Sequence, residues 1–248
     1  MARRGRRYYR TLNVGLIIIL LIVLSLVISG TALGFALSRR RGGVLSINSL
    51  NFYAVVHGNF NNRQDANLVA QQVAASGGAG FVHLDSELDF VVIVAIYSRE
   101  QEANLVSVRL SSEFQASVLP INIASVSLHS YSQDSAILLA NYFNLAIESF
   151  FTLLNLSESL ETSGITDAHA STILTQKRTT LNNRARDVLA IDDQELVDVI
   201  RTLSAFYTEF ALSITSILSS SNRVSLASSI RYLTAVNLFS FYNIKINI

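Results

Sequence analysis

Residues 60–69 read FNNRQDANLV, and residues 97–106 read YSREQEANLV. In both stretches an aromatic residue is followed six residues later by the same tetrapeptide, Ala-Asn-Leu-Val, and the offset between the two copies is 37 throughout. Each aromatic residue closes a β-prone run, and each tetrapeptide lies in a segment whose apolar residues have helical spacing. The repeat therefore predicts two related strand–helix units within one small domain.

Strand and helix signals alternate on both sides of the repeat. Strands are expected at residues 52–56, 81–84, 90–97 and 121–128, and helices at 62–75 and 98–111. Asn61 or Asn62 is expected to cap the first helix, and Ser98 with Gln101 to form a capping box at the second. The order β-α-β-β-α-β predicts a ferredoxin-like domain over residues 50–130, with two helices on one face of a four-stranded sheet.

Six positions in this domain match a known family motif. They are Tyr53, Gly58, Phe60, Ala66, Tyr97 and Ala103. Tyr53 begins a β run that closes at Gly58 and Phe60, and the later positions fall at equivalent places in the two halves. In this pattern residues 52–110 resemble the SPOR domain, a sporulation-related, peptidoglycan-binding module of bacterial envelope proteins. The resemblance implies a bitopic envelope protein that binds glycan strands at the cell wall or division septum.

The same resemblance places the glycan-binding face on the side of the sheet away from the helices. In this chain that face is expected to carry Ala54, Val56, Val91 and Ile93. Soluble domains rarely expose an apolar patch of this kind. Two interpretations follow: the face binds glycan, or it is a packing face covered by the helical region that follows.

An uncharged apolar segment, residues 14–37, precedes this domain. Its 24 residues are long enough to cross a bilayer as a helix. Five arginines precede the segment and three follow it, which favours a cytoplasmic N-terminus and an extracytoplasmic 42–248 region. We expect a basic tail at 1–13, one transmembrane helix at 14–37 and a linker at 38–49. A cleaved signal peptide is the alternative, because Gly34-Phe35-Ala36 fits a small-x-small cleavage site.

Residues 131–248 have helical periodicity throughout and predict a C-terminal helical bundle or helical hairpins. The expected helices are 133–161, 167–190, 193–219 and 224–242, with Asp192 and Glu195 capping the third. The first helix is apolar nearly all round, so it is expected to be buried on most sides. A second membrane span at 136–156 is the alternative, opposed by Asn141, Asn144, Glu148 and Asn155. The fold class is therefore α+β with an N-terminal anchor.

Charge and motif content indicate no enzyme, no cofactor and no metal site. Residues 42–248 carry 11 basic and 18 acidic residues, a net charge of −7 that disfavours nucleic-acid binding. The chain has no cysteine and no catalytic or phosphate-binding motif. The four histidines, His57, His83, His129 and His169, are widely spaced. His57 is interpreted as a core or edge residue rather than a glycan contact. Asp85, Glu87 and Asp89 are interpreted as a solvated turn rather than a cation site.

The sequence thus predicts a single-pass, non-enzymatic protein of the cell membrane, associated with peptidoglycan in cell-wall or division processes. The alternative is a membrane-tethered scaffold whose SPOR-like sheet packs on its own helical region and which assembles with protein partners. The expected partners are the membrane, glycan strands, and envelope or division proteins.

Overall fold

The residues of the repeat lie in a region of four strands and two helices, whose order β-α-β-β-α-β follows the strand and helix signals of the sequence. The computed structural model describes residues 43–47, 49–85, 89–112, 114–123, 126–131, 133–220 and 224–246. The predicted basic tail, the predicted transmembrane helix and residues 38–42 lie outside the described residues. The strands are β2 (Leu50–Phe60), β3 (Phe81–Leu84), β4 (Phe90–Tyr97) and β5 (Ala116–Ile123), and the helices are α2 (Arg63–Ala75) and α3 (Glu100–Leu110).

The four strands form one antiparallel sheet in the order β3-β4-β2-β5. β5 is an edge strand, which explains why it accommodates Pro120, a residue without a backbone N–H donor. Pro120 was expected to precede the last strand; it lies within it, opposite Tyr53. The α+β class predicted from the sequence is confirmed.

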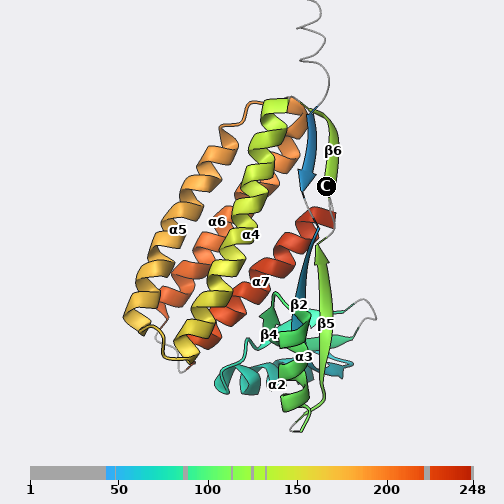
Figure 1. The fold of residues 1–248 in the computed structure, drawn as a ribbon, viewed down its shortest axis with the longest axis vertical. Coiled ribbons are helices and arrows are strands. Elements are labelled where there is room, and N and C mark those ends of the chain that lie inside the picture. The colour runs from blue at the N-terminus through green and yellow to red at the C-terminus, as the bar shows by residue number, and fades with distance from the viewer. Residues whose placement is uncertain are drawn as a thin grey trace, which may run out of the picture. The chain divides into compact units, whose positions relative to one another are not determined.

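A second, two-stranded sheet continues this one. β1 (Gly43–Ile47) pairs antiparallel with β6 (Val126–Tyr131), so that Gly43 lies opposite Tyr131. Because β1 leads into β2 and β5 leads into β6, the two pairs follow one another along the same two stretches of chain (Figure 1). Gly43–Ile47 was expected to belong to a linker. It forms a strand because it pairs with β6, which follows the whole four-stranded sheet in sequence.

The two helices of the repeat begin differently. Asn62 caps α2 as predicted, accepting a hydrogen bond from the backbone N–H of Asp65 at 2.9 Å. The capping box predicted at Ser98 and Gln101 is wrong, because the N-cap of α3 is Arg99, which makes no side-chain capping bond. Arg99 instead pairs with Glu102 within the first turn of α3.

Four long helices follow the sheet: α4 (Gln133–Glu161), α5 (Asp167–Leu189), α6 (Val197–Ser219) and α7 (Leu226–Ile246). A short 3-10 turn, Gln194–Leu196, precedes α6, and its cap is Asp193 rather than the predicted Asp192. Short connections make successive helices antiparallel, so the end of α5 and the start of α6 lie at the same end of the bundle as the start of α4 (Figure 1). α7 crosses the others obliquely and extends toward the sheet (Figure 1).

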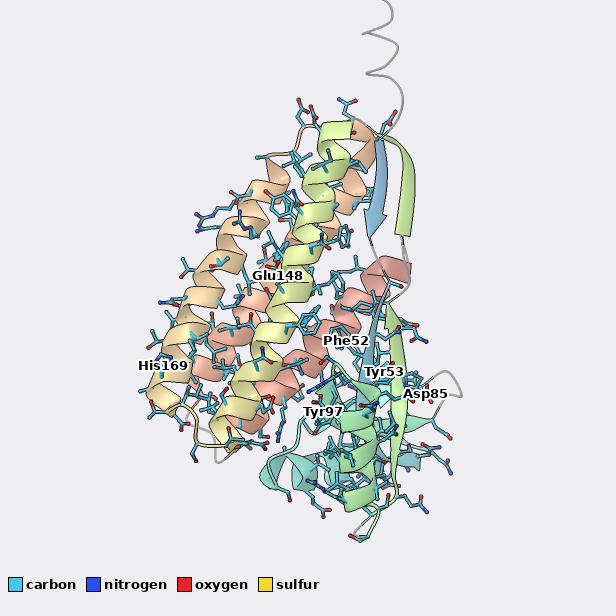
Figure 2. All side chains as sticks on the ribbon, viewed as in Figure 1. Phe52, Tyr53, Asp85, Tyr97, Glu148 and His169 are labelled. Atoms are coloured by element: carbon cyan, nitrogen blue, oxygen red, sulfur yellow. The ribbon has the colours of Figure 1, made fainter. Side chains whose placement is uncertain are left out.

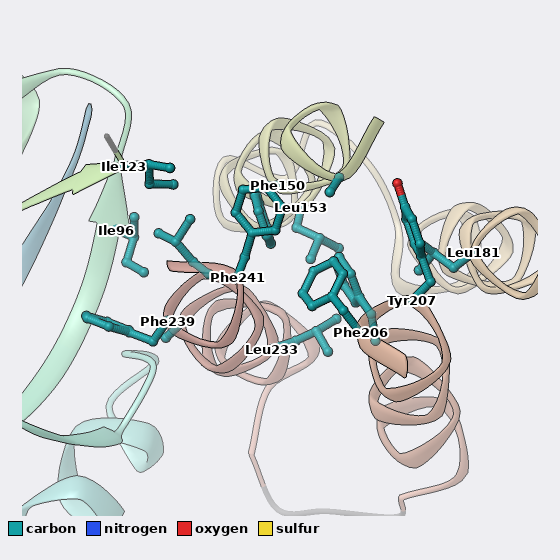
Figure 3. Close-up of a cluster of buried hydrophobic side chains, with 14 of the residues drawn as sticks. Ile96, Ile123, Phe150, Leu153, Leu181, Phe206, Tyr207, Leu233, Phe239 and Phe241 are labelled. Atoms are coloured by element: carbon teal, nitrogen blue, oxygen red, sulfur yellow. The ribbon is translucent and has the colours of Figure 1, made fainter. Parts of the chain in front are cut away.

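One apolar core joins the sheet to the helices. Phe150 of α4 packs edge-on against Phe52 of β2 and against Phe241 of α7, with ring centroids 6.4 and 5.5 Å apart. Figure 3 shows Ile96 and Ile123 of the sheet facing Phe239 and Phe241 of α7, with Phe150 of α4 above them and Phe206 of α6 on the side away from the sheet. Gly43–Ile248 accordingly form one compact unit by their contacts.

α4 buries one stripe of side chains rather than its whole circumference. The buried residues have heptad-like spacing: Ala136, Leu139, Phe143, Ala146, Phe150 and Leu153. Asn141, Asn144, Glu148 and Asn155 are exposed on the other side. Among the described residues one helix, Asp134–Glu161, is long and apolar enough to cross a membrane by length and composition. Its single buried stripe is the pattern of an amphipathic helix that packs one face against a protein core.

Candidate functional site

The four residues predicted on the open sheet face all lie in the interior. Val91 and Ile93 are 2% and 0% exposed, and Ala54 and Val56 are 0% and 4% exposed. They belong to the same core cluster as Phe150 of α4 and Phe241 of α7. We call this side of the sheet the bundle face. The structure thus places these side chains against the protein's own helices and away from solvent.

Two bulges set which side chains reach the bundle face. Val55 pairs with Ala95 but Val56 pairs with Ile93, so Val94 is an extra residue in β4. The second bulge, at Gly58 and Asn59 of β2, uses the left-handed conformation of Gly58, whose φ is 59°. Because of the first bulge, Ile96 rather than Ala95 shares a face with Ile93.

The family-motif positions divide between the interior and the junction with the helical region. Ala66 of α2 and Ala103 of α3, the equivalent alanines of the repeat, are both fully buried. Tyr53, Phe60 and Tyr97 are half-buried. Tyr97 lies where the sheet meets the helices (Figure 2). Burial raises the pKa of the Tyr97 phenol, the nearby Arg231 guanidinium lowers it, and the carboxylate of Glu161 raises it.

α7 holds the loop between α2 and β3 through polar contacts that the sequence analysis missed. Ser228 Oγ donates to the carbonyl oxygen of Gly78 at 2.6 Å, and Arg231 Nη1 donates to that of Gly77 at 2.7 Å. Arg231 also pairs with the carboxylate of Glu161 at the end of α4. We call this set of contacts the glycine clasp. The sequence feature that could have predicted these contacts is Arg231 itself, because it is the first charged residue in a long apolar helix.

The glycine residues of this loop are required by their surroundings. Gly80 has a φ of 62°, and a Cβ atom there would lie 2.4 Å from the carbonyl oxygen of Ala70. A Cβ atom at Gly78 would lie 2.5 Å from a methyl group of Val73. The loop therefore passes close to α2 only because it lacks side chains.

A cavity of about 530 Å³ lies beside the glycine clasp between α2, α6 and α7. None of the described residues that line it is charged. Its polar lining includes Asn67 and Gln71 of α2, Ser216 of α6 and Tyr232 of α7, over a floor that includes Ala70 and Ile217. This size suits a small ligand or one end of a chain molecule. An uncharged lining with amides, hydroxyls and one aromatic ring suits a neutral hydroxylated ligand.

The histidines and acidic residues weighed from the sequence are separated from this cavity. His57 stacks on Phe114 and His83 on Phe239, with ring centroids 4.3 and 4.0 Å apart. Burial lowers the pKa of both imidazoles, while Asp85 raises that of His83. His169 lies on the outer side of α5 and Asp85 at the β3–β4 connection (Figure 2).

The backbone N–H of Asp85 donates to the carbonyl oxygen of Asp89 at 2.8 Å, whereas Glu87 lies outside the described residues. Within the described ranges, no group of three or more His, Asp or Glu residues is placed to bind a metal ion.

Comparison of the chain with protein-family models, with curated proteins and with solved structures finds no match. The resemblance to the SPOR domain stays a prediction, and the site is defined by its geometry alone.

Proposed function

We propose that this chain is a membrane-tethered, non-enzymatic scaffold of the cell envelope, in which a SPOR-like sheet supports a helical region. One observation carries the proposal: Ala54, Val56, Val91 and Ile93 are buried against α4 and α7. A glycan chain reaching these residues would first have to displace α7, whose aromatic side chains share their core. The helical region is then the part that presents a surface to protein partners in the envelope.

The remaining elements of the proposal come from the sequence. The segment 14–37 anchors the chain as a single span, the N-terminus is cytoplasmic, and residues 42–248 are extracytoplasmic. The ferredoxin-like assignment is supported by the element order β-α-β-β-α-β together with the strand order β3-β4-β2-β5. SPOR membership rests on the six motif positions.

The test is retention of the full chain, in detergent micelles, on purified peptidoglycan. The scaffold proposal predicts no more retention than on a control column that contains the same detergent but no peptidoglycan. It also predicts an even membrane signal, without septal enrichment, for a fluorescent fusion of the full chain. Retention on the wall material, or septal enrichment, would contradict it. Deleting residues 131–248 is a poor test, because the deletion would expose the bundle face.

Peptidoglycan association is the second candidate, favoured by the uncharged cavity between α2, α6 and α7. Here the exposed ring of Tyr232 would stack on a sugar, and the amides of Asn67 and Gln71 would bind its hydroxyl groups. On this candidate Tyr232→Ala abolishes retention on peptidoglycan, whereas Leu212→Ala, a change at an exposed residue of α6 outside the cavity lining, leaves it unchanged. Equal retention of both variants would rule out the cavity as the glycan site.

A further inference from the structure

The start of the described chain lies at one particular end of the helical region. Gly43 begins β1 and lies opposite Tyr131, and α4 begins two residues later at Gln133. Because α4, α5 and α6 are successively antiparallel, the end of α5 at Leu189 and the start of α6 at Val197 lie at this same end (Figure 1). We call it the entry end.

The entry end exposes large apolar side chains on three different helices. Ile137 and Leu138 of α4, Leu189 of α5 and Val197 of α6 are each between 38 and 57% exposed. Single exposed apolar residues are common on soluble proteins. Here, however, they occur on all three described helices that begin or end at the entry end, namely α4, α5 and α6.

Chain length determines what lies near this end. Only five residues, 38–42, separate the apolar segment 14–37 from Gly43. Even when fully extended, five residues span about 17 Å. If 14–37 spans a bilayer, as the proposed function holds, Gly43 at the entry end is kept within about that distance of the lipid surface. At such an effective concentration a weak contact is formed most of the time.

We propose that the entry end is a membrane-contact surface, in which Ile137, Leu138, Leu189 and Val197 insert into the headgroup region of the bilayer. This inference rests on the proposed single-span anchor. Its occupant is lipid because the chain itself holds this end against the membrane, and because side chains that insert only shallowly leave their helices' polar groups in water.

Charged groups at the same end limit the depth of the contact. Asp134 stands in the first turn of α4, Asp192 and Asp193 in the α5–α6 connection, and Asp198 in the first turn of α6. Carboxylates disfavour the hydrocarbon layer and are repelled by anionic lipids. The contact is therefore expected to be shallow.

The chain contains no tryptophan, so one introduced tryptophan reports a single position in the full-length protein. The variants are Leu138→Trp and Leu189→Trp at the entry end, with Val108→Trp as the control. Val108 is 73% exposed on α3, which lies in the sheet region away from the entry end (Figure 1). Each variant is reconstituted into phosphatidylcholine vesicles, with and without phosphatidylcholine brominated near the carboxyl ends of its acyl chains, which quenches tryptophan at the boundary between headgroups and acyl chains.

We expect a blue-shifted emission and about twofold or stronger quenching of both entry-end variants, with no quenching of Val108→Trp. Vesicle flotation of the same samples separates the two levels of the proposal. Variants that float but are not quenched at the entry end would overturn the contact surface and leave the anchor standing. A chain that does not float would overturn the anchor, and the contact surface with it.

Discussion

The two halves of the repeat begin from the same tetrapeptide and end in different surroundings. Ala66 and Ala103 are both fully buried, and the leucines two residues later, Leu68 and Leu105, are both exposed. The first half, however, has a capped helix and a glycine loop held by α7, whereas the second half has neither. The shared motif thus determines which side of each helix is buried. The residues outside the motif determine how each helix is capped and what its following loop contacts.

Gly80→Ala is expected to have the largest effect on this comparison. The added methyl group meets a backbone carbonyl and forces a left-handed alanine, at a cost of about 2–4 kcal/mol in free energy of unfolding. Denaturant unfolding of the full chain in micelles measures it. Gly164→Ala is the control, because the nearest atom to its Cβ position lies 3.4 Å away. Equal stability of the two variants would show that the first-half loop is not tightly packed.

Arg231→Ala tests the clasp itself. It removes a charged donor from the carbonyl oxygen of Gly77 and leaves Glu161 without its partner, which should destabilise the protein by about 2 kcal/mol. The matched change in the second half is Arg99→Ala, which breaks an exposed ion pair with Glu102 and should cost about 0.5 kcal/mol or less. Thermal unfolding followed by circular dichroism distinguishes them. A larger loss at Arg99 would reverse the proposed difference between the halves.

The N-terminal caps of α2 and α3 give a test with a smaller expected change in stability. Asn62→Ala removes the bond to the backbone of Asp65 and should cost about 1 kcal/mol. Ser98→Ala should leave stability unchanged within about 0.5 kcal/mol, because Ser98 makes no cap of α3. If the two variants lose the same stability, α3 is capped by Ser98 after all.

The smallest effect at neutral pH concerns His57 and His83, both of which belong to the first half. Their pKa values are lowered by burial, so the unfolded chain binds protons more readily than the folded chain. Stability is therefore unaffected above the ordinary histidine value and falls as the pH drops from about 6.5 through the lowered pKa. We expect the melting temperature to decrease less steeply in His83→Phe, which keeps the stack on Phe239. An unchanged slope would contradict a buried, neutral His83.

The sequence predicted elements whose signals are local. The bounds expected for β3, β4 and α4 match the structure, because β-branched runs and helical periodicity mark them, and Asn62 was identified as a cap from its own chemistry. Features that depend on distant partners were not predicted. β1 becomes a strand only when β6 pairs beside it, and the bulge at Val94 arises from pairing across the sheet.

The candidate site shows the same limit. The resemblance to the SPOR domain, together with alternation along strands, grouped Ala54, Val56, Val91 and Ile93 on one face, and their apolar character indicated a covering element. The cover was expected from the first C-terminal helix. α7 supplies much of it, with Phe239 and Phe241, because it alone runs obliquely from the bundle to β3 and β4. Crossing angles depend on side-chain packing between helices, which periodicity in one helix does not encode.

The position of α7 along the chain has a consequence for folding kinetics. The sheet is synthesised early, yet its bundle face is completed by the last described element. During synthesis the apolar bundle face of the strands therefore stays uncovered until α7 has been made and has docked. Contacts between segments as distant in sequence as α7 and the sheet form slowly. Folding intermediates that expose apolar surface in the meantime are prone to aggregate. The rate-limiting step of folding is accordingly expected to be the docking of α7, and chaperones that bind apolar surface should act on this chain before that step.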